Sequence, residues 1–202
     1  MNSITTYLAL GDSYTIGEAV SESQRWPVQL AARLGWAAPT IVAQTGWTTD
    51  ELSLAIDAAG LASTYDRVSL LIGVNNQYLG RTVANYAAEF RVLLDRAVVL
   101  AGGDVKRVFV VSIPDWGVTA FAARYGRGRG RGRIGREIDA FNAAARTVCE
   151  SVGVRFIDIT PTSRDRGGDA DMLANDGLHP ASAMYTRWVD DIVHTLPVAG
   201  PG

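Results

Sequence analysis

The sequence has little of the material from which disulfides, metal sites and membrane spans are built. Cys149 is the only cysteine among the 202 residues, so no disulfide can form within the chain, and only two histidines are present. Without clustered cysteines and histidines, we expect neither a metal site nor a cofactor. No apolar run approaches the roughly 20 residues that a membrane-spanning helix needs, so no membrane insertion is expected.

An excess of charge is also lacking. The net charge is −2, which gives no general attraction to nucleic acids or anionic membranes. Residues 1–6 lead almost directly into a strand and lack the basic start, apolar stretch and cleavage site of a signal peptide, so we expect a cytoplasmic protein. Neither a Gly-x-Gly-x-x-Gly turn after the first strand nor a P-loop lysine is present, which disfavours a nucleotide-binding module. Nothing in the sequence indicates the oligomeric state.

Short apolar runs that alternate with amphipathic segments predict an α/β fold. Alternation of this kind favours parallel strands joined by right-handed helical crossovers, and hence a three-layer α/β/α sandwich. The length suits one domain over residues 1–202 with a loose tail at 197–202. Cys149 is expected to be buried on the apolar face of a helix. Strands are predicted near 7–10, 40–43, 67–72, 107–112 and 154–158, and helices near 26–34, 48–59, 83–98, 134–152 and 181–196.

Ser13 stands where the first predicted strand turns into the following segment. The apolar run Tyr7–Leu10 ends in Gly11-Asp12-Ser13, which is typical of a buried strand followed by a tight turn. In an open α/β sheet, catalytic groups gather at the carboxyl ends of strands. Ser13 is therefore a candidate nucleophile, although Gly-Asp-Ser alone is also ordinary turn chemistry. Asp12 is interpreted as a turn or cap residue.

A candidate base for this serine lies near the other end of the chain. Asp176-Gly177-Leu178-His179-Pro180 places a carboxylate three residues before a histidine, in a turn that precedes the last predicted helix. A serine becomes a good nucleophile when a histidine takes its proton, and a carboxylate on the other ring nitrogen orients that histidine. The second histidine, His194, falls within a helical pattern and is interpreted as structural. The sequence therefore predicts a catalytic triad of Ser13, His179 and Asp176.

Four separated blocks of the sequence resemble those of the SGNH hydrolases, within the GDSL-type esterases and lipases. The blocks are 11–13 (Gly-Asp-Ser), 43–48 (around Gly46), 73–77 (around Asn75) and 176–180 (around His179). The resemblance covers roughly residues 5–196. It departs in the third block, where Asn76 stands in place of the usual aspartate.

The resemblance implies more than periodicity can give. It implies a flavodoxin-like fold whose five parallel strands lie in the order 2-1-3-4-5. It also implies an oxyanion hole made by the backbone N–H groups of Ser13 and Gly46 and by the side-chain amide of Asn75. Glycine lets a backbone approach an oxyanion closely, and an amide is a donor that stays neutral, so these residue types suit the role.

Four aromatic residues lie just beyond predicted strand ends. Tyr14, Trp47, Tyr78 and Trp116 are candidates for lining the acyl or alcohol pocket, with ordinary loop anchoring as the alternative. We expect a small-molecule ester as the substrate and hydrolysis through an acyl-enzyme. The small size and the lack of an apolar lid favour short acyl chains. An acyltransferase with the same triad is the alternative, because it differs only in the group that accepts the acyl chain.

Alternating glycine and arginine at about 123–133 predict a mobile loop, because such a segment has no apolar surface to bury. We favour a solvated insertion between the fourth strand and its helix. The alternatives are a flap that attracts anionic substrates and a segment that binds RNA or another anion. The single short tract and the net charge of −2 make nucleic-acid binding the weakest of the three.

Overall fold

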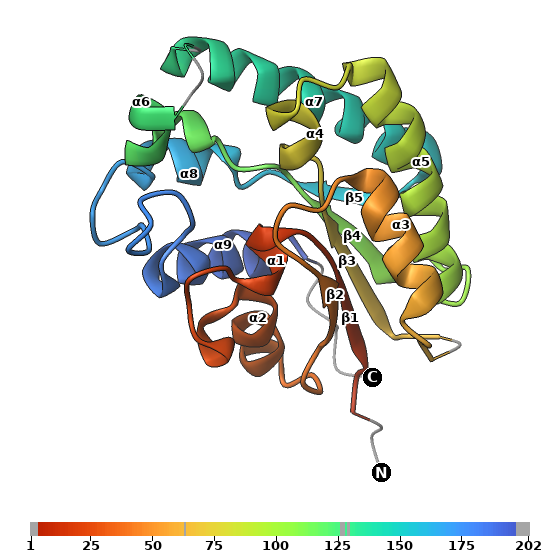
Figure 1. The fold of residues 1–202 in the computed structure, drawn as a ribbon. Coiled ribbons are helices and arrows are strands. Elements are labelled where there is room, and N and C mark those ends of the chain that lie inside the picture. Colours follow the sequence, from red (N-terminus) through yellow and green to blue (C-terminus); the bar gives the residue numbers. More distant parts are fainter. Residues whose placement is uncertain (1–3, 63, 126–127, 129, 197–202) are drawn as a thin grey trace.

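Five strands form one parallel sheet within the residues that the structure describes. The structure, a computed structural model, describes residues 4–62, 64–125, 128 and 130–196 (Figure 1). The predicted strand order 2-1-3-4-5 and the parallel pairing are confirmed. The strands are β1 (Tyr7–Gly11), β2 (Thr40–Ala43), β3 (Arg67–Leu71), β4 (Val108–Val111) and β5 (Arg155–Ile157), paired in the order β2-β1-β3-β4-β5.

The central strands are covered on both faces, which explains why their sequences are apolar without alternation. Every residue of β1 and β4 is buried, whereas the edge strands β2 and β5 expose some of their side chains. A parallel sheet with helices on both sides requires this distribution.

Helices form the two outer layers (Figure 1). The described helices are α1 (Ser13–Ile16), α2 (Trp26–Leu34), α3 (Thr49–Ala58), α4 (Val74–Tyr78), α5 (Val83–Leu100), α6 (Ala120–Tyr125), α7 (Arg131–Val152), α8 (Thr160–Arg166) and α9 (Ser182–Thr195), with short 3₁₀ turns at Glu22–Gln24, Val105–Arg107 and Trp116–Val118. Helices α2 and α9 pack together on one side of the sheet, and α3, α5 and α7 pack side by side on the other. The predicted three-layer sandwich is confirmed.

The predicted helix boundaries follow from local chemistry. Pro27 lies in the first turn of α2, and Gly35 ends that helix in the left-handed conformation with φ of 68°. Helix α3 begins with a reciprocal capping box between Thr48 and Glu51, as the spacing of these residues predicts.

The segment predicted as a loop at about 123–133 is shorter than expected. Helix α6 reaches Tyr125 and α7 begins at Arg131, so the prediction is wrong at both ends. Gly130 caps α7, and the backbone N–H of Arg133 already donates to its carbonyl at 2.9 Å. Because arginine favours helix, α7 starts before its first apolar residue. Residues 126, 127 and 129 lie outside the described residues, as does the predicted tail at 197–202.

Cys149 is fully buried on α7, as predicted. Burial raises the pKa of its thiol to about 12, so the thiol stays protonated and unreactive at neutral pH. None of the described helices is both long and apolar enough to cross a membrane.

Candidate active site

Ser13 is the first residue of the four-residue helix α1, directly after β1. Asp12 caps this helix, because its Oδ1 accepts a hydrogen bond from the backbone N–H of Tyr14 at 3.0 Å. Gly11 is required by close packing. A Cβ there would lie 2.1 Å from Thr15 Oγ1 and 2.5 Å from the carbonyl of Leu71. The turn therefore fixes the Ser13 backbone at the carboxyl edge of the sheet.

Asp12 is completely buried, and its Oδ2 has no hydrogen-bond partner in the described structure. Burial raises the pKa of this carboxyl to about 7, although backbone N–H groups, among them that of Tyr14, oppose the shift. Asp12 therefore acts as the cap predicted from the sequence, and it holds its negative charge less readily than an ordinary aspartate.

His179 and Asp176 form a close pair in the loop before α9. His179 Nδ1 lies 2.6 Å from Asp176 Oδ2, while Asp176 Oδ1 accepts the backbone N–H groups of Leu178 and His179 at 2.9 Å each. Gly177 adopts φ of 69°, which allows the tight turn between the two residues. Burial opposes ionisation of Asp176, but these hydrogen bonds outweigh it and lower the pKa of the carboxyl. With Nδ1 engaged, Nε2 is the ring nitrogen available as a base.

The histidine ring is held by packing as well. Its exposed fraction is only 8%, and the ring of Tyr14 meets it edge-on with 5.8 Å between centroids. Tyr14 in turn contacts Trp188 of α9 at 6.0 Å. These contacts restrict the orientation of the imidazole.

The predicted oxyanion-hole residues lie at the ends of β2 and β3. Gly46 adopts φ of 90° in a turn closed by a hydrogen bond from the N–H of Trp47 to the carbonyl of Gln44. Asn75, in the first turn of α4, donates from Nδ2 to the carbonyl of Trp47 at 2.9 Å. An amide nitrogen carries two hydrogens, so this bond leaves one available to a ligand.

These residues meet in a cavity of about 190 Å³. Of the predicted site residues, Ser13, His179, Gly46, Asn75, Tyr14, Tyr78 and Trp116 line it. Asp176 lies behind His179. Trp47 is not among the lining residues and instead contributes its carbonyl to Asn75. The structure therefore brings together residues separated by as many as 166 positions in the sequence.

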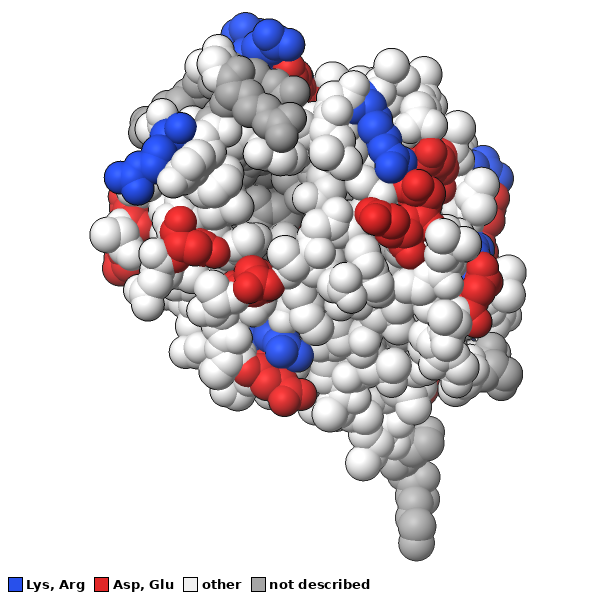
Figure 2. All heavy atoms as spheres, in the orientation of Figure 1, with Lys and Arg blue, Asp and Glu red and all other residues white. Residues whose placement is uncertain are grey.

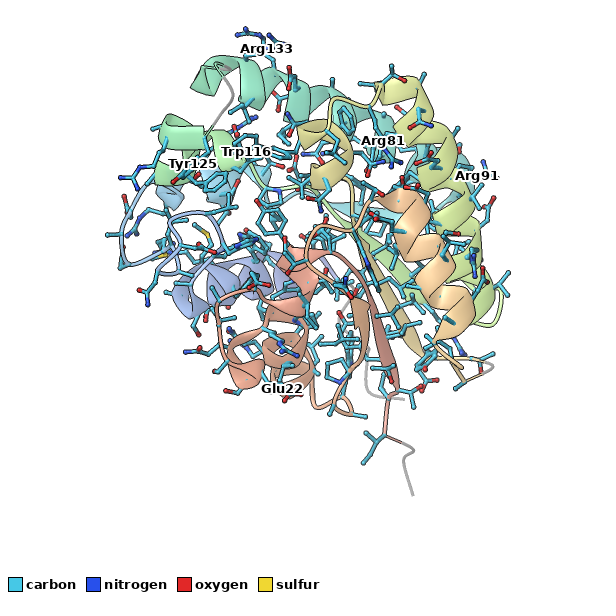
Figure 3. The ribbon with its side chains drawn as sticks, viewed as in Figure 1. Glu22, Arg81, Arg91, Trp116, Tyr125 and Arg133 are labelled. Atoms are coloured by element: carbon cyan, nitrogen blue, oxygen red, sulfur yellow. The ribbon has the colours of Figure 1, made fainter. Side chains whose placement is uncertain are left out.

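Aromatic side chains form one wall of this cavity. Trp116, labelled in Figure 3, donates from Nε1 to Gln77 Oε1 at 2.9 Å, and its ring contacts Tyr78 at 5.7 Å and Phe121 at 6.3 Å. Phe121 of α6 also lines the cavity and was not predicted from the sequence, as is true of Thr45, Val74 and Leu178. Thr119 offered a signal for α6, since its hydroxyl accepts the N–H of Ala122 as a helix cap does.

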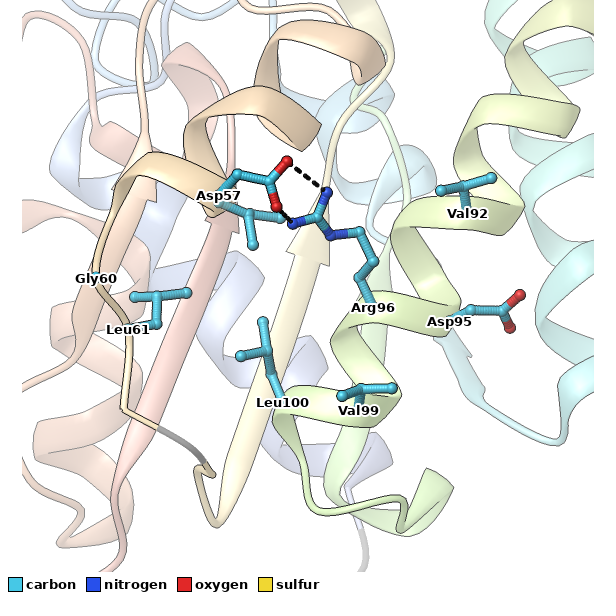
Figure 4. Close-up of a pocket in the computed structure, with 9 residues that line it drawn as sticks. Asp57, Gly60, Leu61, Val92, Asp95, Arg96, Val99 and Leu100 are labelled. Carbon is cyan, nitrogen blue, oxygen red and sulfur yellow. Dashed lines mark hydrogen bonds and ion pairs between the residues drawn. The ribbon is translucent and has the colours of Figure 1, made fainter.

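A larger cavity of about 640 Å³ lies between α3 and α5 (Figure 4). Its titratable residues include Arg96 and Asp57, which form an ion pair, and Asp95, which pairs with Arg91. The lining is otherwise mainly aliphatic, and its described residues include no serine or histidine. This cavity therefore lacks the groups that the chemistry requires. Within the described part of the chain, no three histidine, cysteine, aspartate or glutamate side chains are placed so that they could hold a metal ion.

Comparison with known proteins points in the same direction. The sequence model of the GDSL-like lipase/acylhydrolase family matches residues 9–187. A comparison with curated protein sequences finds no match.

Solved structures of similar fold cover nearly the whole chain. TesA is 22% identical with a TM-score of 0.71, and the alignment covers 95% of this chain and 97% of the TesA chain. An acetyl-xylooligosaccharide esterase from a Geobacillus is 17% identical with a TM-score of 0.72, covering 98% and 96%. Phospholipase A1 from Streptomyces albidoflavus is 18% identical with a TM-score of 0.69, covering 96% and 100%. At these identities the likeness shows a shared fold.

Proposed function

The chain belongs to the GDSL-like lipase/acylhydrolase family and is an ester hydrolase of the SGNH type, and we propose that it acts through an acyl-enzyme on Ser13. The observation that carries this proposal is the pairing of His179 with Asp176 at 2.6 Å, because His179 lines the same cavity as Ser13, Gly46 and Asn75. These are a base, its orienting carboxylate, a nucleophile and two oxyanion donors.

In the proposed first step, Ser13 Oγ attacks the ester carbonyl while His179 Nε2 takes its proton. Asp176 stabilises the imidazolium that forms. The tetrahedral intermediate collapses when His179 gives the proton to the leaving alcohol, which leaves an acyl group on Ser13. Water then repeats the sequence, and the products are a carboxylic acid and the free enzyme.

The negative charge on the tetrahedral oxygen needs donors that are already in place. The backbone N–H groups of Ser13 and Gly46 and the second amide hydrogen of Asn75 supply them in this proposal. Donors fixed by the fold need no reorganisation during the reaction, so each contributes about 10²–10³ to turnover.

The shape of the cavity supports a short acyl chain. A volume of about 190 Å³ against the rings of Trp116 and Tyr78 leaves little room beyond a small acyl group. In Figure 2, positive and negative side chains are interspersed, without a broad area of one charge among the described residues of that face. This distribution supports a small, uncharged ester as the substrate.

The test compares hydrolysis of p-nitrophenyl acetate, butyrate and octanoate by the wild type and Ser13→Ala. We expect activity on the short esters that the substitution abolishes. Equal activity of the two proteins would refute the mechanism, and a preference for octanoate would refute the short-chain assignment. Product analysis with an added alcohol separates hydrolysis from acyl transfer.

A further inference from the structure

Two adjacent asparagines at the start of α4 hold one loop from two positions. Asn75 donates to the carbonyl of Trp47 at 2.9 Å. Asn76 binds Thr49 twice, accepting its backbone N–H at 3.1 Å and donating to its Oγ1 at 2.7 Å. The segment held in this way directly follows Gly46. The bonds therefore fix two of the proposed oxyanion donors, Gly46 and Asn75, relative to each other.

Asn76 is completely buried, and both hydrogens of its side-chain amide have acceptors. Its second amide hydrogen points at Glu89 Oε2, 3.4 Å away on α5. The Thr49 hydroxyl also donates to Glu89 Oε2. Since that hydroxyl proton is already committed, Thr49 Oγ1 can only accept from position 76. The surroundings therefore require a hydrogen-bond donor at this position.

We propose that Asn76 is a positioning residue for the oxyanion hole, and that Glu89 is the reason an amide stands there. The inference rests on the proposed function. An aspartate at position 76 would place two carboxylates around a single hydroxyl proton, and two like charges at this distance in a buried site repel each other strongly. The loop that carries Gly46 would then lose its anchor.

Other charges around the pair are already engaged. Arg81, labelled in Figure 3, binds Asp50 at 2.6 Å and Glu89 at 3.3 Å, and Glu51 accepts the N–H of Thr48. Hydrogen bonds from Arg81 and Thr48 lower the pKa of Asp50 to about 2, so Asp50 stays ionised during an assay. Arg81 is therefore already shared between the carboxylates of Asp50 and Glu89, and it cannot alone neutralise a third one at position 76.

The test measures kcat and KM on p-nitrophenyl acetate for Asn76→Asp and for Asn76→Asp/Glu89→Gln. The single substitution should lower kcat about tenfold or more with KM nearly unchanged, because donors are displaced while the acyl pocket is intact. In the double variant the single carboxylate stands at position 76 and the amide at position 89. The amide at position 89 can then donate a hydrogen bond to the carboxylate. It should recover most of the lost kcat.

A matched control and a pH series separate positioning from a general effect of charge. Asn85 also donates to Glu89, at 2.8 Å, but to the other carboxylate oxygen, Oε1, and it lies on the exposed side of α5. Asn85→Asp should therefore leave kcat unchanged. The ratio of Asn76→Asp to wild-type kcat should rise from about pH 8 to about pH 5, because the paired carboxyls retain a proton at the lower pH.

The inference is overturned if folded Asn76→Asp keeps the wild-type kcat, or if the double variant is no better than the single one. If Asn76→Asp does not fold, the double variant decides alone. A folded double variant with kcat close to the wild type supports the inference, and a folded but inactive one overturns it. Ser13→Ala, measured alongside, tests the proposed function itself. Full activity of Ser13→Ala would refute the proposed function, whatever the result for the Asn76 variants.

Discussion

Asp176 serves His179 through both of its carboxylate oxygens. One oxygen accepts from Nδ1 at 2.6 Å, and the other accepts two backbone N–H groups that fix the carboxylate in the loop. In the proposed mechanism the side chain therefore sets the tautomer of the imidazole and stabilises its positive charge, but it does not react itself.

Replacement of Asp176 by asparagine should reduce kcat less than replacement of the nucleophile. Asparagine keeps an oxygen for the backbone N–H groups but presents an amide to His179 Nδ1, which favours the wrong tautomer. We expect a loss of about 10⁴ in kcat, against about 10⁶ for Ser13→Ala. Steady-state kinetics on p-nitrophenyl acetate, with circular dichroism to verify folding, makes the comparison. An equal collapse of both folded variants would contradict this ranking.

Asn75 offers a second test at the same scale. Asn75→Ala removes the amide hydrogen proposed for the oxyanion and the bond to Trp47, and should lower kcat by about 10²–10³ with a small effect on KM. Leu79, exposed in the following turn, supplies the control variant Leu79→Ala, which should keep wild-type kinetics. A change in KM with unaltered kcat would argue that Asn75 binds the ground state instead.

The sequence narrows the choice of a base, because the chain has only two histidines and only His179 lies in a predicted turn. Serines are common in this chain, so the prediction of Ser13 rests on its place directly after the first strand. The aromatic residues that line the cavity were harder to predict, because any exposed strand end can carry an aromatic ring. Tyr14, Tyr78 and Trp116 line the cavity whereas Trp47 does not.

At the scale of elements, long segments were predictable and short ones were not. Helices α5 and α7 repeat their apolar residues over several turns, which gives a clear period. Helices α1, α4, α6 and α8 have four to seven residues, too few to complete a pattern. Their positions depend on contacts distant in sequence, such as the bond from the N–H of Phe121 to the carbonyl of Gly177.

Helix α6 should determine acyl-chain preference through Phe121. Its ring contacts Trp116 and lines the cavity, so Phe121→Ala enlarges the pocket and should raise the octanoate-to-acetate ratio of kcat/KM several-fold. Tyr125→Ala is the matched control. Tyr125 packs against Phe121 with tilted rings, 4.8 Å between centroids, but is half exposed and does not line the cavity. An equal change in both variants would mean that disturbance of α6, not pocket size, sets the preference.

For the whole molecule, the sequence predicts the three layers of the sandwich but not which strands lie next to each other in the sheet. Alternating strands and helices require parallel crossovers, yet many strand orders satisfy that requirement. The order 2-1-3-4-5 came from the resemblance to the SGNH hydrolases. That order has a functional consequence, because β1 lies between β2 and β3 and so brings Ser13 between Gly46 and Asn75.

The pH dependence of stability tests the buried cap at Asp12. Its pKa is about 7 in the folded protein against an ordinary value of 3.8. Between these values the unfolded chain releases the proton first, so stability falls as pH rises from about 4 to about 7 and then levels off. A gap of roughly three pH units corresponds to on the order of 4 kcal/mol. Asp12→Asn keeps a capping oxygen but cannot ionise, so the stability of this variant should not fall with rising pH in this way.

Thermal unfolding at about pH 5 and about pH 8 tests this. The free energy of unfolding of Asp12→Asn, relative to that of the wild type, should increase by roughly 2 kcal/mol or more from the lower to the higher pH. Asp176→Asn supplies a control whose difference from the wild type should not change between these two pH values. The pKa of Asp176 is lowered on folding, so its contribution is present above the ordinary aspartate pKa and is lost only as pH falls through the lower folded value. A Tm difference between wild type and Asp12→Asn that is the same at both pH values would show that Asp12 is already ionised in the fold. In that case the backbone N–H groups of Tyr14 and Gly73, which oppose the shift, would outweigh the effect of burial on the carboxyl.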